Sequence, residues 1–391
     1  MYEISFLVGL KNNLEYSKKF YQHFRDIYPD EQLVFVSFGS SDGTHEWLES
    51  LIDKNVRLFY EPNSKTLSDT YNKAIEISTK NHVCFLHNDM VLGKNFVKEI
   101  QKALQINPLI YYKTVEPPIF EDDNRLWKEI QDFGNDFDDF KYNDFFKFEE
   151  LNKNKENLFV ENSSFFLAAE KALLTNINGL DPLFNPMFCE DDDLILRLKL
   201  SGQKPLLSLS AIVYHFVSKT SRFSEEYQNI SKKLEENSHR NFYRKWGFRN
   251  DSLHRNKRTY GLILENSTED SLKLLEPFVS HIYTNDEVIK YVEKEQEKTA
   301  VDLTEKFRKT SDPIADDVVL KFDADKISEK NINIFRNLND IIIARKTNKR
   351  KYKFLDFIFP VSSNNFKVRD VHFKILKENL LEKQLIVRKN V

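Results

Sequence analysis

Four consecutive carboxylates occupy residues 190–193, within the segment Phe188–Leu194. The positive end of a helix dipole favours acidic residues in a first turn, which accounts for one or two of the four but not for the whole run. Closely spaced carboxylates repel one another, so at least one should have a raised pKa, as a general base requires. The run therefore predicts acid–base chemistry at the start of a helix.

A second cluster is His87-Asn88-Asp89, directly after the apolar run 83–86. A carboxylate and an imidazole at a strand end can ligate a divalent cation; oxygen ligands suit Mg²⁺ or Mn²⁺, and imidazole favours Mn²⁺. An Asx-rich turn that caps the next helix explains the same residues equally well. His215, at the end of a later apolar strand, joins the candidates, although a single histidine is more often structural.

These clusters need a scaffold that brings strand ends together, and the first hundred residues have the pattern of one. Apolar runs predict strands at 4–10, 33–38, 56–60 and 83–86, with helical spacing at 16–27, 47–51 and 67–78. This alternation favours a parallel sheet covered on both faces, with ligands at the carboxyl ends of its strands. Polar segments lie at three such ends, at 11–13, 37–44 and 87–89.

Residues 121–150 differ in kind. Eleven acidic and four basic residues are interleaved with eight aromatic ones, which run from Trp127 to Phe148. One interpretation is a surface insertion whose rings pack inward. The other is an acceptor-binding lobe, because sugars stack on aromatic rings and bond to carboxylates. The sequence leaves both interpretations open.

The composition changes near residue 250. Residues 258–391 hold one glycine and a new alternation of apolar and charged segments, which predicts a second, smaller α/β domain. We expect strands at 260–264, 281–284, 318–322 and 341–344, and helices at 272–278 and 286–307. Asp323 and Asp325 fit a solvated turn better than a metal site. The basic run 345–353 fits a solvated loop or a contact to an anionic acceptor, polymer or lipid headgroup.

The overall composition excludes several classes of protein. With 58 basic and 61 acidic residues, the molecule as a whole is not an electrostatic binder of nucleic acids or membrane surfaces. Two cysteines, Cys84 and Cys189, cannot build a disulfide framework, which indicates a reduced, cytoplasmic setting. The N-terminus has the pattern of a strand and not of a signal peptide, and no apolar run reaches 18 residues, so we expect no transmembrane segment. Peripheral membrane contact stays open.

Taken together, the motifs of the first 250 residues resemble the inverting family 2 glycosyltransferases, which have the nucleotide-diphospho-sugar-binding GT-A fold. The matching segments are Ile4–Asn13, Phe38–Thr44, Phe85–Asp89, Asn178–Phe184, Phe188–Leu194 with Arg197 and Gly202, Val213–His215, and Lys245–Gly247. The order and spacing of the Glu-Asp block is the specific part. The resemblance implies a Rossmann-like mixed sheet in a GT-A domain at 1–250, followed by the C-terminal α/β domain at 258–391.

The resemblance also implies roles for individual residues. Asp191, or else Glu190, would be the general base that deprotonates an acceptor hydroxyl, and one sugar would be transferred with inversion. Asp89 would ligate Mn²⁺ or Mg²⁺ on the donor diphosphate, with His215 as a further ligand. The residues expected to line the nucleotide-sugar pocket are Gly9, Lys11, Asn12, Ser37, Gly39, Asn72, His87 and Asn88.

Two departures from the family pattern bear on the partners. Ser37 stands where the family often has an Asp that recognises the base, which leaves the donor open among UDP-, GDP- and dTDP-sugars. His87 stands at the first acid of an Asp-x-Asp pair and could contact the metal, the ribose or neither. The implied acceptor is a glycan, a lipid-linked molecule or a protein.

The leading function is therefore a metal-dependent inverting glycosyltransferase. The alternative is a non-catalytic carbohydrate- or nucleotide-sugar-binding or scaffolding protein on the same fold, which the changes at Ser37 and His87 allow. The intact Glu190-Asp191 pair favours the enzyme. A nucleotidyltransferase on a similar sheet would need a glycine-rich phosphate loop near the N-terminus, where Gly9 stands alone.

Overall fold

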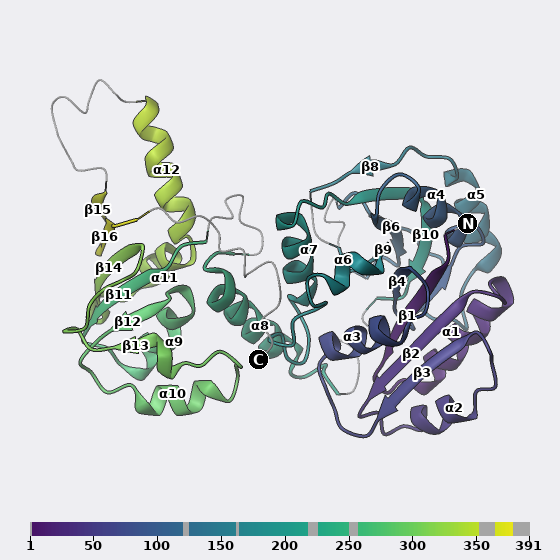
Figure 1. Cartoon of the computed structure of the whole chain (residues 1–391), viewed down its shortest axis with the longest axis horizontal. Coiled ribbons are helices and arrows are strands. Elements are labelled where there is room, and N and C mark those ends of the chain that lie inside the picture. The colour runs from purple at the N-terminus through teal and green to yellow at the C-terminus, as the bar shows by residue number, and fades with distance from the viewer. Residues whose placement is uncertain are drawn as a thin grey trace. The chain divides into compact units, whose positions relative to one another are not determined.

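The computed structural model describes residues 2–119, 125–161, 164–217, 226–249, 257–351 and 364–377, with the backbone alone for 346–351. The chain divides into two compact units (Figure 1). The first contains Met1–Pro182 and Glu190–Leu234, and the second contains Leu183–Cys189 and Glu235–Leu385. The start of the predicted insertion, 121–124, and the side chains of the basic run beyond Arg345 lie outside the description.

Within the described residues, the first unit is built on a ten-stranded mixed sheet. Eight strands follow the order β3-β2-β1-β4-β9-β6-β10-β5, while β7 pairs with β6 and β8 pairs with β10. The strands are β1 (Ile4–Leu10), β2 (Gln32–Phe38), β3 (Val56–Glu61), β4 (His82–Leu86), β5 (Met90–Leu92), β6 (Leu109–Glu116), β7 (Lys128–Ile130), β8 (Leu158–Phe159), β9 (Leu167–Glu170) and β10 (Leu206–His215). The first four are parallel, whereas β9 runs antiparallel between β4 and β6. The predicted mixed α/β sheet is confirmed.

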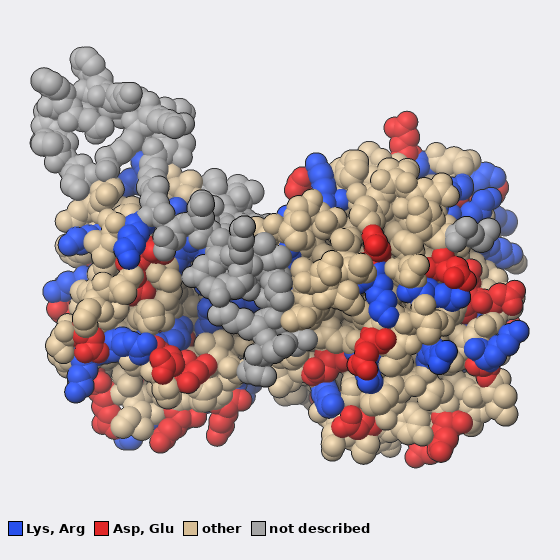
Figure 2. All heavy atoms as spheres, viewed as in Figure 1, with Lys and Arg blue, Asp and Glu red and all other residues tan. Residues whose placement is uncertain are grey.

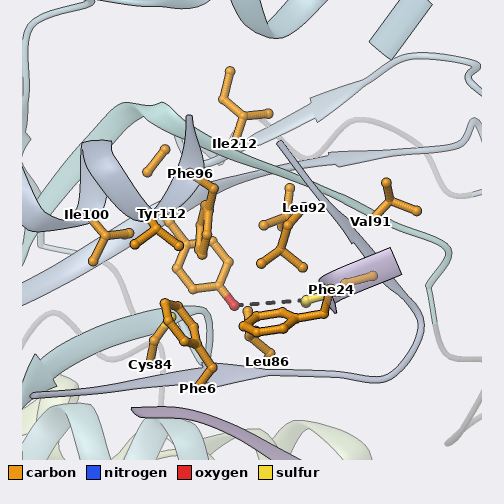
Figure 3. Close-up of a cluster of buried hydrophobic side chains, with 14 of the residues drawn as sticks. Phe6, Phe24, Cys84, Leu86, Val91, Leu92, Phe96, Ile100, Tyr112 and Ile212 are labelled. Carbon is orange, nitrogen blue, oxygen red and sulfur yellow. Dashed lines mark hydrogen bonds between the residues drawn. The ribbon is translucent and has the colours of Figure 1, made fainter. Parts of the chain in front are cut away.

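Two hydrophobic cores cover the two faces of this sheet, because side chains alternate along each strand. Phe6 of β1 belongs to the first core, with Phe24 and Phe96 (Figure 3), and Leu7 belongs to the second, with Tyr71 and Leu198. The helices of this unit are α1 (Leu14–Ile27), α2 (Thr44–Ser50), α3 (Leu67–Ile77), α4 (Phe96–Leu104), α5 (Tyr142–Asn152), α6 (Lys171–Thr175) and α7 (Glu190–Leu200). Helices α1, α2 and α4 contribute to the first core and α3, α6 and α7 to the second.

The aromatic residues of the 121–150 segment pack inward. Phe133, Phe137, Phe140 and Phe145 are buried in the first core, where Phe140 lies 5.0 Å from the ring of Tyr214 between centroids. These four rings pack inward, as the interpretation of a surface insertion expects. They are not available to stack on a sugar, so the acceptor-lobe interpretation loses the observation that suggested it.

The second unit is a smaller α/β domain, as predicted. Its described strands form a six-stranded sheet in the order β13-β12-β11-β14-β16-β15. The strands are β11 (Tyr260–Glu265), β12 (His281–Tyr283), β13 (Phe307–Arg308), β14 (Val318–Asp323), β15 (Asn365–Val368) and β16 (Val371–Ile375). The helices are α8 (Ser231–Trp246, of which the residues from Glu235 belong to this unit), α9 (Glu269–Leu275), α10 (Ile289–Gln296), α11 (Glu329–Arg336) and α12 (Leu338–Lys351), with 3₁₀ turns η1 (Glu276–Phe278), η2 (Thr304–Lys306) and η3 (Ala324–Lys326).

Two expected elements of this unit are wrong. The helix expected at 286–307 is only α10, because the side chain of Gln296 bonds to the backbone of Val301 and Leu303 and stabilises a loop there. The strand expected at 341–344 lies inside α12. Leu338 and Ile342, four residues apart, are buried on one face of that helix, so the apolar run has helical and not strand spacing.

Surface features agree with the composition. Figure 2 shows basic and acidic side chains interspersed on the visible face of each unit. None of the helices described is both long and apolar enough to cross a membrane. Cys84 and Cys189 are both buried.

Candidate active site

The pairing of β5, β6 and β10 brings His215 to Asp89. The turn after β4 leads into β5, which runs antiparallel to β10 with Met90 opposite His215. The backbone N–H of Phe216 donates to the Asp89 carbonyl oxygen at 2.9 Å. Strand β6 is parallel to β10 and ends at Glu116, which lies on the other side of the His215 ring.

Three candidate metal ligands form a compact cluster. One ligand atom from each of His87, Asp89 and His215 lies within 4.8 Å of the others. His215 Nε2 is 3.4 Å from Asp89 Oδ1, and His87 Nδ1 is 4.0 Å from the same oxygen. Asp89 and His215 are buried, whereas His87 is partly exposed. The structure thus brings the predicted pair together and adds His87 to it.

The two imidazoles of the cluster differ in charge. Burial lowers the pKa of His87 to about 4, outweighing the opposite effect of Asp89. Burial also disfavours a charged His215, but the carboxylates of Asp89 and Glu116 outweigh it and raise the pKa of His215 to about 9. At neutral pH, His87 is therefore neutral, and His215 holds a proton between two carboxylates.

One pair of atoms in the cluster, His215 Nε2 and Asp89 Oδ1, has the spacing of two ligands on one divalent cation, whereas His87 Nδ1 lies 4.0 Å from the same oxygen. Within the part of the chain that the structure describes, neither ring nitrogen of His215 makes a well-formed hydrogen bond, although carboxylate oxygens lie 3.4 Å and 3.5 Å away. Two ligand atoms that share one cation at about 2.1 Å are roughly 3.0–3.4 Å apart when the angle between them is 90–110°. One carboxylate and two imidazoles suit Mn²⁺ better than Mg²⁺.

Asn88 ties the turn after β4 to helix α1. Its Nδ2 donates to Ser17 Oγ of α1 at 3.0 Å, and the residue is buried. The side chain therefore anchors the turn that carries His87 and Asp89 to α1.

The acidic run begins α7, as predicted. Two residues with left-handed backbone precede it, Phe188 (φ 77°) and Cys189 (φ 67°). Asp191 is partly exposed, and its Oδ1 accepts a hydrogen bond from the backbone N–H of Asp192 at 2.8 Å. Loss of hydration on burial, and then the charge of Asp192, raise the pKa of Asp191 to about 7. One carboxylate of the run thus has the raised pKa that its spacing predicts.

The last acid of the run is structural. Asp193 is fully buried and pairs with Arg197, whose Nε lies 2.8 Å from Asp193 Oδ2. The same guanidinium donates to the carbonyl oxygens of Ile177 at 2.7 Å and Gly179 at 2.6 Å. This clamp fixes α7 to the turn before it.

Asn72 holds the same turn from α3. Its Nδ2 donates to the Leu180 carbonyl oxygen and its Oδ1 accepts from the Leu180 N–H, both at 2.8 Å. Gly179 has φ +65°, and a Cβ there would collide with the Asn72 amide. Asn72, which we expected to line the nucleotide pocket, therefore positions the turn that Arg197 joins to α7.

Tyr71 connects the acidic helix with the metal cluster. It is fully buried and donates from its hydroxyl to the Leu86 carbonyl oxygen at 2.6 Å. Burial is the main reason that the pKa of Tyr71 is raised, and the charges of both Asp89 and Glu190 add to it. The charges of Asp89 and Glu190 therefore both act on this one hydroxyl.

Two of the loops expected to bind the nucleotide meet at Lys11. Its Nζ donates to the Gly39 carbonyl oxygen at 2.7 Å and to Ser64 Oγ at 2.8 Å. Asn12 Oδ1 accepts from the N–H of Ser41 at 2.8 Å. Gly39 has φ +69°, and a Cβ there would collide with Ser64. The glycine is thus required for the close approach of the loop after β2 to Ser64.

Ser37 and Gly9 lie near the carboxyl ends of β2 and β1, respectively. Ser37 is buried, with its Oγ 3.0 Å from His45 Nε2. A Cβ on Gly9 would lie 2.9 Å from Thr70 Cγ2, so Gly9 allows α3 to pack on β1. Among the described residues, His45 is the imidazole next to the position where the family often has its base-recognising Asp.

The sequence reasoning missed several residues of this site. Glu116 was overlooked because β6 was not recognised, although a carboxylate that ends an apolar strand is the signal already used for Asp89. Lys128 lies 3.3 Å from Glu116 and comes from the 121–150 segment. No sequence pattern predicts the contact of Lys128 with Glu116, or that of Tyr71 with Leu86.

Comparison with known families covers the N-terminal part of the chain. Residues 5–174 match Glycosyl transferase family 2. This part of the chain is a family 2 glycosyltransferase domain. The match confirms the predicted family, the GT-A type of fold and the enzyme class. It ends before α7 and His215, so the roles of Asp191 and His215 in this glycosyltransferase are argued from the geometry.

Solved structures give a distant likeness. TarS 1-349 of S. aureus is 13% identical, with a TM-score of 0.41 over 62% of this chain and 72% of that one. Its complex with UDP-GlcNAc has the same identity and coverage and a TM-score of 0.40. GalNAc-T7 with UDP, GalNAc and Mn²⁺ is 12% identical, with a TM-score of 0.42 over 55% of this chain and 43% of that one. A search of the curated proteins finds no match.

Proposed function

We propose that this glycosyltransferase is metal-dependent and inverting, and that it moves one sugar from a nucleoside-diphosphate donor to an acceptor hydroxyl. The observation that carries the proposal is the cluster of Asp89, His215 and His87, together with the raised pKa of Asp191, about 7, and the charges of Asp89 and Glu190 that both act on Tyr71. A cation site and a nearby general base are what this transfer needs.

Asp89, His215 and His87 would hold Mn²⁺ or Mg²⁺. Bound there, the cation neutralises charge on the diphosphate as it departs. His87 is neutral at neutral pH and can ligate without losing a proton. Lys11, tied to Gly39 and Ser64, would add a positive charge beside the nucleotide.

Asp191 would accept the proton of the acceptor hydroxyl. The acceptor oxygen forms a bond to the anomeric carbon as the bond from that carbon to the phosphate oxygen breaks, and the nucleoside diphosphate leaves with the electron pair. A single in-line displacement of this kind inverts the anomeric configuration. Glu190 is the second candidate for the base, since it lies one residue away and is buried.

Ligand-induced stabilisation tests the proposal. Mn²⁺ together with the matching nucleoside diphosphate, among UDP, GDP and dTDP, is expected to raise the thermal midpoint of the full chain. Stabilisation by about 2.7 kcal/mol is expected when the ligand is at 100 times its Kd. Asp89→Asn should remove the metal-dependent part of the shift. Asp138→Asn is the matched control, because Asp138 is an exposed carboxylate that pairs with Lys19.

Stabilisation by Mn²⁺ and a diphosphate without any release of that diphosphate from donor sugars would support the non-catalytic alternative. A shift that is the same with and without Mn²⁺, or that survives in Asp89→Asn, would contradict the proposed metal site.

The pH dependence of transfer tests the base. Since Asp191 must be ionised to accept a proton, kcat/KM should rise about tenfold per pH unit below pH 7 and level off above it. The charge of Asp192 contributes to the raised pKa of Asp191. Asp192→Asn should therefore move the acidic limb to lower pH. A limb that does not move, or that moves to higher pH, would contradict the assignment.

A further inference from the structure

Four side chains of alternating charge form a line through the interior of the first unit. Lys128 Nζ lies 3.3 Å from Glu116 Oε2, and Glu116 Oε1 lies 3.5 Å from His215 Nδ1. His215 Nε2 lies 3.4 Å from Asp89 Oδ1. The four side chains are 3%, 8%, 8% and 1% exposed, in the order Lys128, Glu116, His215, Asp89. Charges that are this far from water must hold one another in place.

The chemistry of imidazole indicates which nitrogen of His215 is available to a cation. When one ring nitrogen of a histidine ligates a metal, the other usually donates to a carboxylate or a carbonyl, which fixes the tautomer and the orientation of the ring. Glu116 stands at Nδ1 of His215, and Asp89 stands at Nε2. Only Nε2 therefore faces the ligand cluster.

The strands that carry Glu116 and Lys128 make the arrangement rigid. Glu116 ends β6 and Lys128 begins β7, and the two strands pair in parallel. With one oxygen of Glu116 beside Lys128, the other remains for His215. Lys128 can thus limit the rotation of the Glu116 carboxylate.

We propose that Glu116, held by Lys128, is a positioning residue that fixes the His215 ring with Nε2 toward the divalent cation. The inference rests on the proposed metal-dependent function. It gives the 121–150 segment a role in this site, which is to supply the lysine that anchors Glu116.

Binding of Mn²⁺ alone to the full chain measures the effect, with free Mn²⁺ followed by electron paramagnetic resonance. Glu116→Gln, which keeps the size of the side chain, is expected to weaken Mn²⁺ binding by about 10–100-fold. Lys128→Met should weaken it severalfold. If Lys128 acts only through Glu116, the double variant should bind Mn²⁺ no more weakly than Glu116→Gln alone.

Spin-echo spectroscopy of the bound Mn²⁺ adds a readout that a general loss of stability would not change. The modulation from directly bound imidazole nitrogen should be weaker in Glu116→Gln than in the unchanged protein at equal occupancy. The neighbouring Lys113–Glu129 ion pair supplies the matched control, because it joins the same two strands without contacting His215. Lys113→Met and Glu129→Gln should keep the Mn²⁺ affinity within about twofold of the unchanged protein, as expected for residues with no shared partner.

The outcomes separate this inference from the proposed function. If His215→Gln loses Mn²⁺ binding while Glu116→Gln stays within twofold of the unchanged protein, the positioning role is overturned and the metal site stands. If the unchanged chain binds no Mn²⁺, or His215→Gln binds it normally, both are overturned. Should Glu116→Gln fail to fold, Lys128→Met decides, since an unchanged Mn²⁺ affinity in it overturns the inference.

Discussion

Asp191→Asn is expected to lose about 10²–10⁴-fold in kcat, because an asparagine of the same shape cannot accept the proton of the acceptor hydroxyl. Its affinity for Mn²⁺ and for the nucleoside diphosphate should stay within about twofold, since Asp191 is not part of the cluster of His87, Asp89 and His215. Release of the nucleoside diphosphate, to an acceptor or slowly to water, measures the rate. Ligand-induced thermal stabilisation measures the affinity.

Two neighbours serve as controls for Asp191→Asn. Asp192→Asn should keep kcat at alkaline pH, where Asp191 is ionised whether or not residue 192 carries a charge. Glu190→Gln separates the two candidate bases: if it loses kcat and Asp191→Asn does not, then Glu190 is the base. A parallel loss of nucleotide binding in Asp191→Asn would contradict its assignment as the base.

The acidic run at 190–193 shows what a local sequence pattern can and cannot predict. Repulsion among carboxylates predicts one raised pKa, and Asp191 has it, but loss of hydration is a larger cause than the charge of Asp192. The same run contains Asp193, whose partner Arg197 also binds carbonyl groups 18 and 20 residues earlier in the chain. Periodicity and composition do not reveal such long-range contacts. The sequence alone therefore could not distinguish the structural carboxylate of the run from the candidate base.

The cluster of His87, Asp89 and His215 shows a second limit of prediction from the sequence. Asp89 and His215 were predicted from the rule that polar residues at strand ends meet at one edge of a sheet, and the structure brings them together. Glu116 obeys the same rule, yet β6 is buried along its whole length and includes charged and polar side chains that no apolar pattern reveals. These side chains are tolerated because partners such as Lys128 come from a segment whose function sequence reasoning could not assign.

The fold was predictable where its signals are local. The alternation of β1 to β4 with their helices follows from short apolar runs and helical spacing. The prediction was wrong where the apolar pattern was ambiguous, as at 341–344. Four consecutive apolar residues are compatible with a strand or with part of a helix, and the burial of Leu338 together with Ile342 is what identifies the helix.

Arg197→Met is expected to lower the free energy of unfolding of the first unit by about 3–5 kcal/mol. The substitution leaves the carboxylate of Asp193 buried without its arginine, and removes the donors to the carbonyl oxygens of Ile177 and Gly179. Urea unfolding of the full chain measures the change. The transition of the first unit is the one that Mn²⁺ and the nucleoside diphosphate shift to higher urea, because a ligand stabilises the unit that binds it.

The matched control is Lys18→Met, which breaks an ion pair whose side chains are 45% and 72% exposed. It should change the free energy of unfolding by no more than about 0.5 kcal/mol. Asp193→Leu combined with Arg197→Met should be less destabilised than Arg197→Met alone, since no buried charge is then left without its counter-charge. A cost below about 1 kcal/mol for Arg197→Met would mean that the clamp does not hold α7. A large cost would show that Asp193 and Arg197 fix the helix that presents Asp191.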